Sequence, residues 1–441
     1  MQYQHAIYIP VILAGLIFSG CTGSNEGVDT HSQTTIYSER VSGLCLVSSE
    51  GDSEVDKRIK RQIKKLLDFP DKLQTWVDLG NAWVKKSKIS NDPGFYLHAQ
   101  ACVDYALKLD INYLPAQELQ VQVLLNNHEF TVASKLASTI VTTAPDSRIG
   151  WASLSDAQLE LGNIEKAQQS VEKLQDLQAG MAFFTRFSYL RWLRGDIKGA
   201  NDALLAALQR RDLRNPHAAA WTFVQGAEIS WHRNDLVGAE ALYNESLKWL
   251  PDFPLALIGL ARIEMARDNP LSAINILEKI KATKISSEAV WLLADASEMA
   301  GDQVAADKNR ARVIALARTS DPLLLARFLS TKNRDNSLAL ELIENERRSR
   351  GGIYIEDAYA WVLYRLGRFE EAQIAIEKAL KWGTKDAKLL FHAGAIKIAA
   401  GDIKGGSALV RNALSLQPLF DYTSSKEAAH LLQEYGDPAN A

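Results

Sequence analysis

Residues 357–372 read Asp-Ala-Tyr-Ala-Trp-Val-Leu-Tyr-Arg-Leu-Gly-Arg-Phe-Glu-Glu-Ala, and this stretch decides the fold. Its first part carries an apolar stripe at helical spacing, which Gly367 interrupts. Glycine tolerates the left-handed backbone conformation that ends one helix and turns tightly into the next. Ala372 then lies early in the second helix, where a large side chain would push the two helices apart. The stretch therefore predicts a helical hairpin.

A small residue recurs at the position of Ala372 along most of the chain. The step between successive members is nearly constant, except for a longer step between Ala200 and Ala239. A period of about 34 residues is typical of a solenoid of helical hairpins, in which no single repeat buries its own apolar face. These repeat-packing residues are Ala99, Ala133, Ala167, Ala200, Ala239, Ala273, Ala306, Ala339, Ala372 and Gly406.

Two further features return at fixed offsets from the small residue. Five residues before it, several repeats have a glycine followed by Asn, Asp or Arg, and two repeats have Asn234 or Asp268 instead, which are the next most tolerant residue types. Twelve residues after it, a proline ends the second helix in three repeats. The glycines are Gly162, Gly195, Gly301, Gly367 and Gly401, and the prolines are Pro145, Pro251 and Pro418.

These positions resemble the tetratricopeptide repeat, whose pattern reads Trp, Leu-Gly, Tyr, Gly, Ala, Phe, Ala, Pro. The resemblance covers residues 68–420 and implies an all-α, right-handed superhelical solenoid of about ten hairpins, with the repeat around Ala339 as the poorest match. Residues 357–372, together with 391–394, resemble a group of exported bacterial tetratricopeptide proteins. The resemblance is carried by Trp76, Leu79, Gly80, Trp83, Trp151, Leu154, Gly162, Ala167, Ala239, Tyr243, Leu247 and Pro251.

Two repeats are longer than the others. About seven extra residues fall within 85–96, where Asn-Asp-Pro-Gly is a turn signal, and five fall near 210–216. Insertions between repeats usually map to loops, which are either tolerated lengthenings or parts of a binding surface. After the last repeat, a helix around 425–435 is expected to cap the array, within a terminal segment of residues 421–441.

Residues 1–20 predict an export signal. They contain no Asp, Glu, Lys or Arg, and an apolar run extends from Ala6 to Phe18, a length typical of a signal peptide. Phe18-Ser19-Gly20-Cys21 resembles the lipobox of bacterial lipoproteins, although a basic residue is missing before the run and Phe18 replaces leucine. The resemblance implies cleavage after residue 20, lipidation of Cys21 and an outer-membrane location facing the periplasm, because Thr22 rather than Asp follows the cysteine. An ordinary signal peptide, or a buried helix before a cysteine, is the alternative.

Residues 21–55 are rich in Ser, Thr, Gly and acidic residues, which predicts a flexible tether. Residues 56–67 then form a basic amphipathic pattern, with Ile59, Ile63, Leu66 and Leu67 on one helical face. Such a helix contacts anionic lipid head groups or packs its apolar stripe on the first repeat, and we favour packing.

Composition excludes several classes of function. The net charge of -3 provides no whole-molecule argument for nucleic-acid binding. The three cysteines are too few for a disulfide framework, although Cys45 and Cys102 could pair after export. We find no phosphate-binding loop, nucleophile elbow or metal-binding histidine pair, so we expect no cofactor, no metal and no enzymatic activity.

The resemblance also implies a concave groove, lined mainly by the first helix of each hairpin. Tryptophan and tyrosine supply large, stiff contact areas at binding sites, so these positions predict an aromatic, mildly acidic groove. The alternative is that the rings pack between neighbouring repeats. A basic clamp for a peptide's terminal carboxylate is not evident, since Asn81 and Lys85 match it only loosely. The groove positions are Tyr189, Trp192, Trp221, Glu228, Trp231, Arg262, Trp291, Asp295, Glu298, Asp357, Trp361 and Tyr364.

These observations favour a membrane-anchored scaffold that binds a protein or extended peptide in the bacterial cell envelope, as an assembly factor for an envelope complex. The alternatives are an adaptor subunit of an envelope enzyme and a glycan-binding protein that uses the aromatic groove. The sequence does not identify the partner.

Overall fold

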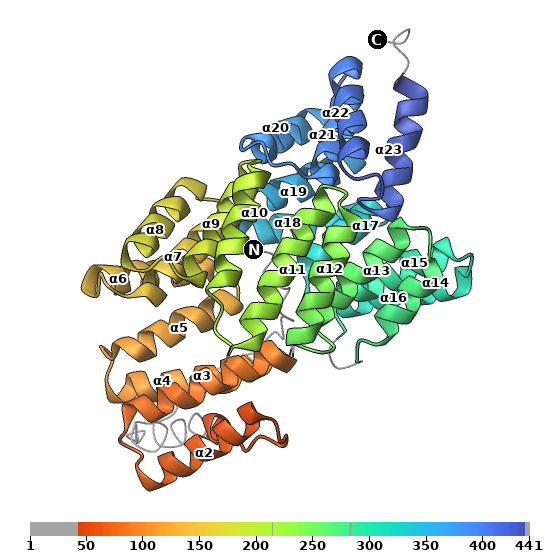
Figure 1. Ribbon diagram of the computed structural model, residues 1–441. Coiled ribbons are helices and arrows are strands. Elements are labelled where there is room, and N and C mark those ends of the chain that lie inside the picture. The colour runs from red at the N-terminus through yellow and green to blue at the C-terminus, as the bar shows by residue number, and fades with distance from the viewer. Residues whose placement is uncertain (1–42, 91, 214, 282–284, 437–441) are drawn as a thin grey trace, which may run out of the picture. The chain divides into compact units, whose positions relative to one another are not determined.

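The computed structural model describes residues 43–90, 92–213, 215–281 and 285–436 (Figure 1). The predicted signal peptide, Cys21 and the first part of the predicted tether lie outside these residues. Contacts divide the chain into an N-terminal unit that ends at His128 and a C-terminal unit that begins at Glu129. Each unit is described by itself.

The N-terminal unit consists of helices packed around one apolar cluster. Helices α3 and α4 form a hairpin, and α2 packs against α3. Ser53 caps α2: its hydroxyl accepts from the Asp56 backbone N–H, and the Asp56 carboxylate accepts from the Ser53 N–H in return. The helices are α2 (Glu54–Asp68), α3 (Leu73–Ser90), α4 (Phe95–Leu109) and α5 (Leu114–Asn126).

The C-terminal unit contains α6, eight successive hairpins from α7/α8 to α21/α22, and a final helix α23 (Figure 1). Its helices are α6 (Phe130–Thr143), α7 (Arg148–Glu160), α8 (Ile164–Leu177), α9 (Met181–Leu193), α10 (Ile197–Gln209), α11 (Pro216–His232), α12 (Leu236–Trp249), α13 (Pro254–Ala266), α14 (Pro270–Glu278), α15 (Ser287–Met299), α16 (Gln303–Ser320), α17 (Pro322–Thr331), α18 (Asn336–Ser349), α19 (Ile353–Arg365), α20 (Phe369–Leu380), α21 (Ala387–Ala399), α22 (Ile403–Leu416) and α23 (Tyr422–Tyr435).

The described residues form helices without a β-strand, apart from one isolated bridge between Leu161 and Gly351. The prediction of an all-α helical-repeat solenoid is therefore confirmed. All ten repeat-packing residues are buried. Nine of them lie in the second helix of a hairpin, and Ala133 lies in α6, at the start of the C-terminal unit. Gly406 shows how close the helices come, because a Cβ there would lie 2.8 Å from the backbone nitrogen of Ile398. The right-handed sense of the superhelix stays a prediction.

The turn inside most hairpins of the C-terminal unit depends on two neighbouring residues. The first has a positive φ: 78° at Gly162, 58° at Asn234 and 63° at Asp268. The next residue often caps the second helix, as when the Asp302 carboxylate accepts from the Ala305 N–H at 2.9 Å. The turn signals that the sequence provides thus define where the second helix of a hairpin starts.

Both insertions were expected to form loops, but each of them partly lengthens a helix. The extra residues after Gly80 mainly lengthen α3, which continues as a helix to Ser90 before the turn that contains Pro93. Those near 210–216 partly lengthen α11, which has 17 residues where most first helices have 13. Helix propensity and packing on the neighbouring hairpin favour continued helix over loop at both places.

The tether ends earlier than predicted. Cys45 and Ser49 are buried, and Cys45 forms a disulfide with Cys102 of α4. The Trp83 indole donates to the Cys45 carbonyl oxygen at 3.1 Å. The polar composition of this segment did not indicate these contacts, which include a disulfide and hydrogen bonds to the backbone carbonyl oxygens of Leu44 and Cys45.

Helix α2 packs its apolar stripe on the first repeat. Ile59 and Leu66 are buried, as the packing interpretation requires. Leu67, which we placed on the same face, is 71% exposed, because the face that α3 covers is narrower than the predicted stripe.

The C-terminal unit also folds so that late repeats contact early ones (Figure 1). The Arg350 guanidinium pairs with Glu160 at 2.6 Å, across 190 residues. The Thr384 hydroxyl donates to the Leu193 carbonyl oxygen at 2.5 Å, across 191 residues. These contacts and a third across 186 residues indicate one superhelical coil that returns after about 190 residues. We call this set of interactions the inter-coil contact.

Candidate functional site

The predicted groove positions lie on first helices of the C-terminal unit, and most of them are covered. Trp192, Trp231, Trp291 and Trp361 are 6%, 4%, 9% and 1% exposed. Asp295 and Asp357 are buried, whereas Tyr189, Trp221, Glu228, Arg262, Glu298 and Tyr364 are half-buried. The rings therefore pack between neighbouring repeats, which was the alternative interpretation, and a groove that binds a partner through them stays a prediction.

The acidic groove positions are paired rather than open. Glu228 of α11 forms an ion pair with Arg262 of α13, and it also accepts from the Tyr243 hydroxyl at 2.6 Å. Burial would raise the Glu228 pKa, but the Arg262 guanidinium and the Tyr243 hydroxyl, with a smaller contribution from His232, together hold the pKa below its usual value. Arg262 in turn lies over the Trp231 ring, 5.6 Å from its centroid.

The same kind of pair joins other first helices. The Lys332 ammonium is 2.6 Å from Asp295, and the His392 imidazole is 2.8 Å from Asp357. Burial raises the pKa of Asp295 to about 6, and Lys332 offsets this only in part. We call these contacts the ion-pair ladder; its members are Asp156 with Arg186, Glu228 with Arg262, Asp295 with Lys332, and Asp421 with Lys388, and the hydrogen-bonded Asp357 and His392 occupy the equivalent place between α19 and α21.

The later repeats cover the predicted groove. The Trp192 indole donates to the Tyr354 hydroxyl of α19 at 3.1 Å, and the Gln417 amide donates to the Trp231 carbonyl oxygen at 2.8 Å. Tyr189, Trp192, Glu228 and Tyr354 line a cavity of only about 50 Å³. This volume suits a few water molecules, so the chain itself supplies the main occupant of this surface.

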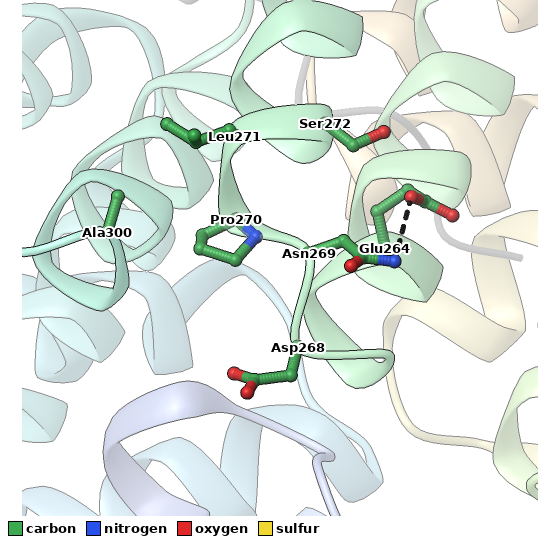
Figure 2. Close-up of a pocket in the computed structure, with 7 residues that line it drawn as sticks. All are labelled: Glu264, Asp268, Asn269, Pro270, Leu271, Ser272 and Ala300. Atoms are coloured by element: carbon green, nitrogen blue, oxygen red, sulfur yellow. Dashed lines mark hydrogen bonds between the residues drawn. The ribbon is translucent and has the colours of Figure 1, made fainter.

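A different surface is open at the turn between α13 and α14. A hollow of about 490 Å³ lies there, and Figure 2 shows its lining, to which the residue after α15 contributes through Ala300. The lining contains two charged residues, Glu264 and Asp268, and both are acidic. Leu271, which also lines the hollow, is 68% exposed.

Leu271 belongs to a row of exposed apolar side chains. Val237 of α12 and Val304 of α16 occupy the same repeat position, two residues before the small residue, and are 75% and 82% exposed. We call these three residues the turn row. In the other repeats of the C-terminal unit this position is polar, with Thr131, Glu165, Lys198, Ser337, Glu370 and Lys404.

The turn row was missed at the level of sequence. Its signal was present, because three consecutive repeats carry an apolar residue where their neighbours carry polar ones. An alignment of the repeats that compared their exposed positions, rather than their packing positions, would have identified the turn row.

Other candidate sites are absent from the described part of the chain. It contains no group of three or more His, Cys, Asp or Glu side chains arranged to hold a metal ion. Nor does any helix within residues 43–436, outside the gaps given above, have the length and apolar character needed to cross a membrane. Cys21, the predicted lipidation site, lies outside the described residues.

Comparison with known proteins agrees with the architecture. The tetratricopeptide repeat family matches residues 358–382, which include most of the hairpin α19/α20. The hairpins on either side have the same arrangement, so the chain contains a matched tetratricopeptide repeat within an array of similar helical hairpins. Folds of this type typically serve protein–protein interaction and are typically non-enzymatic.

Among solved structures, the chain is similar to PilW, a type IV pilus biogenesis factor, with 16% identity over 48% of this chain and 96% of PilW and a TM-score of 0.40. It is similar to PilF of Pseudomonas aeruginosa, with 14% identity over 47% and 93% of the two chains and a TM-score of 0.39. It is also similar to the human IFIT1 dimer with m7Gppp-AAAA, with 16% identity over 74% and 76% and a TM-score of 0.49. Likenesses this distant assign no function. None of the curated protein sequences matches the chain significantly.

Proposed function

We propose that this protein is an exported scaffold that is anchored to the bacterial outer membrane through lipidated Cys21 and binds a protein partner in the cell envelope. Solenoids of helical hairpins expose an extended surface to other proteins, and a covalent lipid on Cys21 would hold that surface near the membrane. The lipobox-like residues Phe18-Ser19-Gly20-Cys21 support the anchor.

The disulfide between Cys45 and Cys102 is the observation that carries the export part of the proposal. It joins the segment just after the tether to α4, and both cysteines are completely buried. Disulfides form and persist in oxidising compartments such as the periplasm and are rare in the cytosol. A structural disulfide so soon after Cys21 therefore favours a protein that has crossed the inner membrane.

The anchor is tested by fractionating bacteria that express the wild type or Cys21→Ser. The wild type is expected in the outer-membrane fraction and the variant in the soluble periplasmic fraction. A Cys45→Ser, Cys102→Ser double variant is the matched control, because it removes two other cysteines and leaves the lipidation site intact. If Cys21→Ser still fractionates with membranes, the lipid anchor is wrong.

The scaffold role is tested by crosslinking in intact cells, followed by affinity purification from solubilised membranes. A defined protein crosslinked to the wild type, and not to an unrelated outer-membrane lipoprotein, supports the role. An enzyme among the crosslinked proteins, with its activity altered by deletion of this protein, would favour an adaptor subunit. A purified protein that binds glycans and crosslinks to no protein would contradict the scaffold.

A further inference from the structure

The turn row repeats one exposed apolar position in three consecutive hairpins. Single exposed apolar residues are normal on protein surfaces. Here, Val237, Leu271 and Val304 occupy one repeat position in three consecutive hairpins, and successive hairpins of a solenoid place equivalent residues side by side. Leu271 also borders the hollow at the α13/α14 turn (Figure 2).

Equivalent turns earlier in the same unit show what kind of segment this surface accepts. The α7/α8 turn is covered by Arg350-Gly351-Gly352, whose Gly351 N–H donates to the Glu160 carbonyl oxygen at 2.8 Å. The Arg350 guanidinium pairs with the Glu160 carboxylate. The occupant of that turn is therefore an extended backbone segment with a basic side chain.

The α9/α10 turn is also covered by a later segment of the chain. Gly383 and Thr384 lie on it, and the Thr384 hydroxyl donates to the Leu193 carbonyl oxygen. Lys381, just before them, is 3.6 Å from Glu165 on α8 and not from a residue of this turn. Two consecutive turns thus take up backbone of the same chain, and the first of them also pairs with a basic side chain.

The hollow at the α13/α14 turn has the charge to accept such a segment. The Asp268 carboxylate is exposed at the turn, and Glu264, the other acidic residue of the lining, pairs with Arg267 at 3.1 Å. The turn row adds an apolar strip that the two covered turns lack, because they have Glu165 and Lys198 at the equivalent positions. Extended basic chain with apolar side chains complements both features.

We propose that the turn row and the adjoining acidic hollow form the docking site for an extended, basic segment of a partner protein. Apolar side chains of that segment pack on Val237, Leu271 and Val304, and a Lys or Arg side chain pairs with Asp268. The proposal rests on the protein-binding function proposed above and assigns that function to the turn surface rather than to the covered groove.

Random dodecapeptides displayed on phage provide the test. The library is selected on the full immobilised chain, and selected peptides are then synthesised with a fluorescent label for anisotropy titrations. We expect enriched peptides that combine apolar residues with Lys or Arg. Their affinity should fall at least tenfold in a Leu271→Glu, Val304→Glu variant and at least threefold in Asp268→Lys.

A Leu205→Glu, Ile374→Glu variant is the matched control, because these two side chains are 59% and 60% exposed but lie outside the turn row. Affinity for this control should stay within twofold of wild type, and circular dichroism should show both double variants folded. Affinity should also fall with added salt, since charge pairing contributes to binding.

Three outcomes would overturn the proposal: no peptide enrichment over a surface without the protein, enriched peptides without basic residues, or equal losses in the turn-row and control variants. Concentration-dependent self-association that Leu271→Glu abolishes would instead identify a second copy as the occupant, and it would also overturn the proposal. If a partner is crosslinked in cells while these tests fail, the proposed scaffold function stands and only its location on the turn surface is wrong.

Discussion

Two kinds of hairpin turn in the C-terminal unit share one sequence signal and differ in what surrounds them. Gly162 and Gly195 lie under the inter-coil contact: a Cβ at Gly162 would lie 2.7 Å from the Gly352 backbone nitrogen, and one at Gly195 would overlap the Gly383 carbonyl oxygen. Gly301 and Gly367 have similar positive φ angles, yet a Cβ there would meet nothing within 4 Å. We call the first pair covered turns and the second pair free turns. The backbone conformation favours glycine at both kinds of turn, whereas the inter-coil contact requires the absence of a Cβ only at the covered turns.

Substitution of the glycine by alanine should lower the free energy of unfolding more at a covered turn than at a free turn, and we expect this to be the largest effect. Gly195→Ala is expected to lower the free energy of unfolding by about 3–4 kcal/mol, since it adds overlap with a neighbouring backbone to the strain of a positive φ. Gly367→Ala should lower it by about 1–2 kcal/mol, from the strain alone. Thermal unfolding of the full-length variants measures both. Equal losses would show that the inter-coil contact adds nothing to stability.

An ion pair at a covered turn should contribute more to the free energy of unfolding than an ion pair beside the acidic hollow. Arg350→Met leaves the mostly buried Glu160 carboxylate without its cation at a covered turn, and we expect a loss of about 3 kcal/mol, the lower end for one partner of a buried pair. The comparison is Arg267→Met beside the acidic hollow. Arg267 and its partner Glu240 are about one-third exposed, its second partner Glu264 is 18% exposed, and the expected loss is below about 1 kcal/mol.

Hydrogen exchange locates the effect of Arg350→Met. The Gly351 N–H, which donates to the Glu160 carbonyl oxygen, should exchange faster in this variant than in the wild type. If the Gly351 N–H keeps its protection while the global stability falls, the lost stabilisation does not come from the inter-coil contact.

The smallest expected effect concerns pH and the hairpin α15/α16, which has a free turn. The folded-state pKa of Asp295 is raised to about 6, above the ordinary value of 3.8, because the carboxyl group is buried. Between these values the folded state holds a proton that the unfolded state has released. The stabilisation from Asp295 is therefore complete below about pH 4 and is lost as pH rises through 6. The loss between about pH 4.5 and pH 7 is about 2 kcal/mol.

Asp295→Asn should remove this dependence. Unfolding temperatures of the wild type and the variant at pH 4.5 and pH 7 provide the comparison, and the wild type should gain more stability at the lower pH. Equal pH dependence in the two proteins would show that Lys332, 2.6 Å away, compensates fully for burial.

The periodic residues allowed the hairpins to be predicted, because helix ends and helix contacts depend on local sequence. The glycine at 367 and the alanine at 372 determine a turn and a close approach within a single hairpin, whatever the rest of the chain does. The covering of the groove was not predictable in the same way. The Trp231 carbonyl oxygen accepts from the Gln417 amide across 186 residues, and this pairing depends on superhelical pitch and not on any local pattern.

The ion-pair ladder could have been predicted from the sequence, but it was not. Glu228 and Arg262 are 34 residues apart, one repeat, and opposite charges at that spacing on first helices were visible in the sequence. They were interpreted as separate groove positions because the expected partner was a ligand. The same spacing read as a contact between neighbouring repeats would have predicted their pairing.

The inter-coil contact also limits how the gene for such a protein can change in length. An ordinary solenoid tolerates gain or loss of one hairpin, because each repeat touches only its neighbours. Here, deleting one repeat between Gly195 and Arg350 would place Arg350 and Gly351 opposite the wrong turn and offset every pairing that now joins the two coils. The number of repeats in this interval is therefore itself a structural requirement, and natural variants should change it in whole coils or leave it unchanged.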